Sequence, residues 1–143
     1  MKSGSKLLLA VLLAVALTMG SGMGLTRMAL AADGIPEVSM EDLKKMIDDK
    51  KTDFLVVDVQ PKGVYDISHI PGAVSFPWDN PLKTNGNLPR DKKLIFYCDC
   101  AHEEDATDVA EQMKQKFRYA NVAILKGGWS KWQEAGYPIE KKK

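Results

Sequence analysis

The chain has 143 residues, of which 45% are hydrophobic and 27% charged, with 20 basic against 19 acidic side chains. This is the length and composition of one globular domain, which excludes a multidomain machine, a collagen-like repeat and a wholly disordered chain. Residues 1–31 carry three basic and no acidic side chains, so the remainder has a formal charge of −2. Without a basic face, no nucleic-acid partner is expected.

The first 31 residues have the layout of an export signal. Two lysines precede an apolar run over residues 7–17, and Ala29-Leu30-Ala31 gives an A-x-A pattern. This order predicts a signal peptide over residues 1–31 and a folded domain over residues 32–143. The alternative is an uncleaved inner-membrane anchor, since residues 7–25 are uncharged over nearly the length of a spanning helix. In both cases we expect an exported, periplasmic or otherwise extracytoplasmic domain, which has a membrane partner only through this segment.

Beyond the signal, helical and strand patterns alternate. Ser39 is placed to cap a helix that begins at Met40, where apolar residues recur at helical spacing. Further helices are predicted at residues 106–117 and 129–135, and strands at residues 54–58, 73–76, 94–97 and 122–125. The strands are apolar runs without a period of two, so both of their faces are expected to be buried. The sequence therefore predicts an α/β domain with a parallel sheet.

Both cysteines follow the strand at residues 94–97. The carboxyl end of a parallel strand is where such folds bind ligands. A single residue separates Cys98 from Cys100, so a disulfide between them would be a strained ring and is an unlikely structural bond. A thiol at a strand end faces the N–H groups and the positive dipole end of the next helix, which favour thiolate and cradle a bound sulfur or oxyanion. We therefore expect a reactive cysteine.

The order of motifs resembles the rhodanese-like family of sulfurtransferases over residues 37–138. The matching pieces are Asp58-Val59, His69-Ile70-Pro71-Gly72-Ala73, Tyr97-Cys98 and Leu125-Lys126-Gly127-Gly128-Trp129, followed by Trp132. The resemblance implies a five-stranded parallel sheet flanked by helices, a cysteine that carries sulfane sulfur as a persulfide, and no metal or organic cofactor. It also implies a small sulfur-containing donor and a thiol or protein acceptor. Asp58 is expected to support the active-site loop, and His69 to be a hydrogen-bonded structural residue.

The loop departs from the family pattern. It reads Cys98-Asp99-Cys100-Ala101-His102-Glu103-Glu104-Asp105. Ala101 and Glu103 stand where family members commonly have Gly and Arg, and Gln60 replaces another Arg. The acidic residues complement the helix dipole on one interpretation. On the other they make thiosulfate, a dianion, a poor substrate. The acidic residues would raise the pKa of a nearby cysteine, whereas the helix dipole would lower it, so the sequence leaves open the direction of the net shift.

Which cysteine would carry the sulfur depends on how the loop is matched to the family pattern. Matching residue by residue from the preceding strand places the family's cysteine at Cys98, whereas matching back from the following helix places it nearer Cys100. We prefer Cys98, because the strand end fixes the thiol that meets the helix N-terminus. The second cysteine then resolves the persulfide or has no role.

Three rival functions remain. The first is an exported dithiol-disulfide redox protein that uses Cys98 and Cys100. The second is a soft-metal site in which His102 joins the two cysteines, although the chain has no second ligand cluster to close a structural site. The third is a rhodanese fold kept as a non-catalytic binding module.

Overall fold

The computed structural model describes residues 34–100 and 102–141. The predicted signal peptide or anchor at residues 1–31 and the loop residue Ala101 therefore lie outside the described residues. Within the described part of the chain, no helix combines the length and apolar character that crossing a membrane requires.

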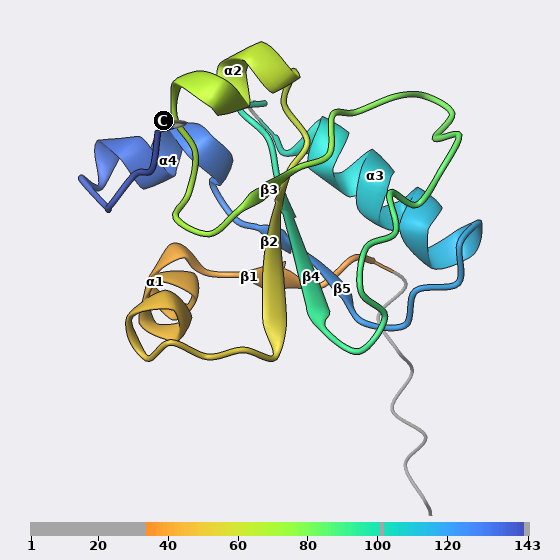
Figure 1. Ribbon diagram of the computed structural model, residues 1–143, viewed down its shortest axis with the longest axis horizontal. Coiled ribbons are helices and arrows are strands. Elements are labelled where there is room, and N and C mark those ends of the chain that lie inside the picture. The colour runs from red at the N-terminus through yellow and green to blue at the C-terminus, as the bar shows by residue number, and fades with distance from the viewer. Residues whose placement is uncertain (1–33, 101, 142–143) are drawn as a thin grey trace, which may run out of the picture. The chain divides into compact units, whose positions relative to one another are not determined.

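Five parallel strands form one sheet in the order β1-β5-β4-β2-β3 (Figure 1). The strands are β1 (Glu37–Val38), β2 (Phe54–Asp58), β3 (Val74–Ser75), β4 (Lys93–Tyr97) and β5 (Val122–Leu125). The helices are α1 (Met40–Asp48), α2 (Lys62–Ile67), α3 (Glu104–Gln115) and α4 (Gly128–Glu134). The α/β class and the five-stranded parallel sheet are thus confirmed. The loop with both cysteines leaves β4, the central strand.

The strand side chains divide between two cores. Val57 and Phe96 point into the core that α3 covers, whereas Val56 and Ile95 point into the core that α1 and α4 cover. Figure 1 shows α3 on one side of the sheet and α1 and α4 on the other. Both faces are buried, which explains why the strands read as unbroken apolar runs.

A local sequence signal accounts for the start of α1. The backbone N–H of Asp42 donates to the hydroxyl of Ser39 at 3.0 Å, so the predicted cap of α1 is confirmed. Two elements were not predicted from residue patterns. Strand β1 has two residues, too few to show a period, and α2 has six residues with none buried, so it has no apolar face to detect.

His69 ties the segment after α2 to the C-terminal end of the chain. Its Nδ1 lies 2.8 Å from the carbonyl oxygen of Tyr65, and the two rings stack with centroids 3.9 Å apart. Its backbone N–H and carbonyl exchange hydrogen bonds of 2.9 and 2.8 Å with Glu140. The interpretation of His69 as a hydrogen-bonded structural residue is confirmed.

Candidate active site

The two cysteines occupy different depths at the end of β4. Cys98 is 2% exposed and belongs to the core beneath α3, whereas Cys100 is half-buried and packs against the outside of that core. Both are free thiols, and the thiol of Cys100 is hydrogen-bonded to that of Cys98. A solute approaching from solvent therefore meets Cys100 first.

The backbone of Cys98 is held against the first turn of α4. Its carbonyl oxygen accepts a hydrogen bond of 2.9 Å from the backbone N–H of Trp129. The neighbouring Gly128 has a φ of +53°, and a Cβ atom there would lie 2.4 Å from the same carbonyl oxygen. Only glycine permits this approach, because a real Cβ never comes so close to an oxygen and because L side chains disfavour positive φ. The Gly127-Gly128 pair thus fixes where the cysteine loop begins.

Two acidic side chains of the loop also bind the start of α4. Glu103 lies in the left-handed region, with φ 53° and ψ 29°, and its Oε1 accepts a 2.6 Å hydrogen bond from the backbone N–H of Gly127. Asp99 accepts a short hydrogen bond from the hydroxyl of Ser130. Glu103 therefore pairs with an N–H at the start of α4, rather than solely complementing the dipole of α3 as one sequence interpretation held. The part played by Ser130 had no sequence signal.

The environment of Cys100 disfavours its thiolate. Burial raises the pKa of the Cys100 thiol above its ordinary value, and its contacts with the Cys98 thiol and the Asp105 carboxylate raise the pKa further. The backbone N–H of Asp105, which donates to the sulfur, lowers the pKa but does not outweigh burial. The direction of the cysteine pKa shift, which the sequence left open, is therefore upward for Cys100. Its thiol is protonated at neutral pH until a base accepts the proton.

Asp58 connects the loop after β2 to the end of β4. The carboxylate is fully buried, and its Oδ1 accepts a 2.8 Å hydrogen bond from the backbone N–H of Gln60. Its Oδ2 accepts from the hydroxyl of Tyr97 at 2.5 Å. Burial raises the pKa of Asp58, and these hydrogen bonds oppose the rise without cancelling it. Since Tyr97 directly precedes Cys98, the geometry is compatible with the loop-supporting role predicted for Asp58.

The remaining loop residues do not assemble a metal centre. His102 is exposed, and its backbone N–H donates to the carboxylate of Glu104 at 3.2 Å. Across the described ranges, no three His, Cys, Asp or Glu side chains gather in a way that could hold a metal ion. The C-x-C-x-H pattern therefore does not bring its three ligands together here.

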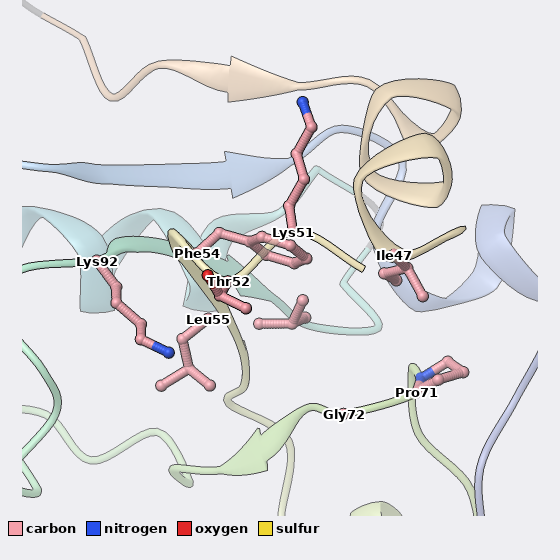
Figure 2. Close-up of a pocket in the computed structure, with 9 residues that line it drawn as sticks. Ile47, Lys51, Thr52, Phe54, Leu55, Pro71, Gly72 and Lys92 are labelled. Carbon is pink, nitrogen blue, oxygen red and sulfur yellow. The ribbon is translucent and has the colours of Figure 1, made fainter. Parts of the chain in front are cut away.

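A separate pocket lies at the amino ends of the strands (Figure 2). It has a volume of about 310 Å³ and is lined by Lys51 before β2 and Phe54 at its start, together with Pro71 and Lys92. Figure 2 shows the Lys51 and Lys92 side chains running away from each other. Because the strands are parallel, this pocket opens at the opposite edge of the sheet from the cysteines, and its lining includes neither a cysteine nor a carboxylate.

Comparison with known proteins places the chain in a family. A family model described as "Rhodanese-like domain" matches residues 39–135. The chain belongs to the rhodanese-like family. Its resemblance to that family, inferred from motifs at residues 58–59, 69–73, 97–98 and 125–132, is confirmed.

Three relatives illustrate the range of the rhodanese-like matches. The "Adenylyltransferase and sulfurtransferase UBA4" of Meyerozyma guilliermondii is 30% identical over 89 residues, which are 58% of this chain and 21% of that protein. The "Thiosulfate:glutathione sulfurtransferase" of Saccharomyces cerevisiae is 25% identical over 115 residues, 71% of this chain and 81% of the yeast protein. The crystal structure of the BH2092 protein of Bacillus halodurans has a TM-score of 0.66 and 30% identity, covering 74% of this chain and 77% of that one.

These matches support sulfur transfer as the family activity. The chain spans only about a fifth of the length of the UBA4 protein, and both curated relatives are named sulfurtransferases. The domain is therefore a rhodanese-like member of a sulfur-transfer family.

Proposed function

We propose that this rhodanese-like domain is a sulfurtransferase that carries sulfane sulfur as a persulfide on Cys100. One observation carries the choice of residue: Cys100 is the more exposed of the two thiols and receives the backbone N–H of Asp105, in the first turn of α3. The sequence preference for Cys98 depended on its thiol meeting that helix N-terminus. The reason now applies to Cys100, because the amide contacts Cys100 while Cys98 is 2% exposed.

The proposed reaction has two transfers. The Cys100 thiol gives its proton to a base in solution, and the thiolate attacks the sulfane sulfur of the donor, whose sulfur–sulfur bond breaks and whose leaving group keeps the electron pair. The product is Cys100-S-SH. An acceptor thiolate then attacks the outer sulfur, a new persulfide forms on the acceptor, and Cys100 leaves as thiolate. The Asp105 N–H stabilises the negative charge on Cys100 at the start and end of this cycle.

The charges of the loop suggest the class of donor. Residues 98–105 contain four acidic side chains and neither lysine nor arginine. A dianion such as thiosulfate is repelled by this arrangement, and at about 4 Å one like charge costs from ~1 kcal/mol in water to ~4 kcal/mol near a protein surface. We propose donors of lower charge, such as a thiol persulfide, with a thiol or protein thiol as acceptor.

A single-turnover experiment tests the carrier. The reduced full chain is exposed to a thiol persulfide without oxygen, the donor is removed, the thiols are alkylated, and peptides are identified by mass spectrometry. An added sulfur atom of about 32 Da on Cys100, lost in Cys100→Ser and kept in Cys98→Ser, is the expected result. Retention of the sulfur in Cys100→Ser would return the assignment to Cys98. Absence of added sulfur from both the wild type and Cys98→Ser would favour the binding-module alternative.

We also propose that the domain works outside the cytoplasm, on the support of the signal pattern in residues 1–31. A C-terminal alkaline phosphatase fusion should be active in cells if export occurs. Fusion to a chain lacking residues 1–31 is the matched control, and equal phosphatase activity from both would contradict export.

A further inference from the structure

The proposed transfer reaction uses one thiol and leaves Cys98 without a part. Cys98 is buried below Cys100, in hydrogen-bonding contact with it, and at 2% exposure it is out of reach of a donor in solution. Its carbonyl is held by Trp129 and packed against Gly128, so its backbone is fixed relative to α4. A group already attached to Cys100 is an electrophile within reach of this thiol.

We propose that Cys98 resolves the Cys100 persulfide, which makes the domain a reductase that converts sulfane sulfur to hydrogen sulfide. This inference rests on the proposed function, since it needs the persulfide on Cys100. It assigns to the buried thiol an activity distinct from transfer to an acceptor, and it accounts for two thiols placed in contact at the end of the central strand.

The step balances without an added oxidant. The sulfur of Cys98 attacks the inner sulfur of Cys100-S-SH, the bond between Cys100 and the outer sulfur breaks, and a bond between Cys98 and Cys100 forms. The outer sulfur leaves with the electron pair and takes the proton of the Cys98 thiol, giving hydrogen sulfide. In this step the outer sulfur is reduced and the Cys98 sulfur is oxidised; the Cys100 sulfur was already oxidised when the persulfide formed. Two equivalents of an external thiol then reduce the disulfide and become a disulfide themselves.

The spacing of the two residues favours a disulfide that does not persist. One intervening residue, Asp99, closes a small and strained ring, and strained disulfides are more easily reduced and serve as catalytic rather than structural bonds. Asp99 is also tethered to Ser130, which limits how far the loop can relax around the ring. Proximity compensates, because the attack is intramolecular. An external thiol can therefore restore the reduced pair.

The test follows a loaded protein in the absence of acceptor. The reduced full chain is loaded with a thiol persulfide without oxygen, freed of donor and incubated, while hydrogen sulfide is trapped with a bimane reagent and the protein mass is followed. We expect the added ~32 Da to be replaced by a loss of ~2 Da from the reduced mass as about one equivalent of sulfide appears. In Cys98→Ser the added sulfur should persist, with sulfide release per loaded sulfur slowed by at least about tenfold.

The outcomes separate this inference from the proposed function. Release at equal rates from wild type and Cys98→Ser would overturn the resolving role and leave the persulfide carrier standing. Absence of loading in Cys98→Ser, together with absence of loading and of sulfide release in wild type, would reject the carrier itself. Cys98→Ala provides a second variant if the serine hydroxyl perturbs the core, and circular dichroism checks that each variant is folded. An added sulfur that persists in wild type would also overturn the inference.

Discussion

The close approach of α4 to the cysteine loop can be tested by adding one methyl group. In Gly128→Ala the new Cβ would lie 2.4 Å from the carbonyl oxygen of Cys98, at a φ of +53°. The backbone contribution is about 1–2 kcal/mol, the expected penalty for an L residue in the left-handed region. Overpacking adds about 1–3 kcal/mol, and loss of the hydrogen bond from Trp129 to Cys98 adds about 1 kcal/mol. We expect the free energy of unfolding to fall by about 3–6 kcal/mol in total.

Two other glycines supply matched controls. Gly136 has a φ of +67°, and a Cβ added there would meet nothing within 4 Å, so Gly136→Ala should lose only the backbone contribution, about 1–2 kcal/mol. Gly63 lies in α2 at ordinary φ with open space around it, so Gly63→Ala should be neutral or stabilise by up to about 1 kcal/mol. Urea unfolding, with the slope checked for constancy, measures all three.

The same glycine variants also report on the site. Because the clash falls on the carbonyl of Cys98, Gly128→Ala should slow persulfide loading, whereas Gly136→Ala should not. If Gly128→Ala is no more destabilising than Gly136→Ala, the inferred contact between α4 and the loop is wrong. The glycine pair would then not be what positions the cysteines.

Other predictions concern charge. In Glu103→Gln the amide oxygen can still accept from the N–H of Gly127, so stability should change little. Because a negative charge is lost, the rate of loading by thiosulfate should rise about fivefold relative to the rate with a neutral donor. An unchanged ratio of the two rates would show that Glu103 has no part in donor selection. In Asp105→Asn an anion next to Cys100 is lost, so the pKa of the Cys100 thiol should fall. Alkylation of Cys100 by iodoacetamide at pH 8 should then be faster than in the wild type. Slower alkylation would contradict the assigned contact between Asp105 and Cys100. Because burial raises the pKa of Asp58, the folded state holds its proton at higher pH than the unfolded state, so this group's contribution to stability should decline as pH rises from about 4 through its folded pKa. Urea midpoints of Asp58→Asn should decline less over that range than those of wild type, and parallel curves would refute the shift.

The sequence predicts the sheet well, and the physical reason is burial. Strands covered on both faces must be apolar throughout, so the runs at 54–58 and 122–125 coincide with β2 and β5. The two-residue β1 has no such signature, because its place depends on pairing with β5, opposite Ile124 and Leu125. Helix α2 has no buried residue to give it an apolar face, although its Tyr65 packs against the second core and stacks on His69.

The sequence predicts where the site lies but not how its loop is arranged. The position of the cysteines follows from the end of a buried strand. Glu103, which lies between Cys100 and Asp105 in the chain, adopts a left-handed conformation, and non-glycine residues rarely do so. The partner of Glu103 is Gly127, 24 residues further along the chain, and no local pattern indicates a pairing over that distance.

The bond between Glu103 and Gly127 restricts how this loop can change by mutation. A Glu103→Arg exchange would bring in the cation that the family resemblance leads one to expect at this position, but in the same step it would leave the N–H of Gly127 without an acceptor, a loss of about 1–3 kcal/mol. Donor preference and loop anchorage therefore share one side chain, and an exchange of that side chain for a cation alters both at once. A route toward an arginine-bearing loop would first need a substitute acceptor near the start of α4, so we expect it to require at least two changes, in that order.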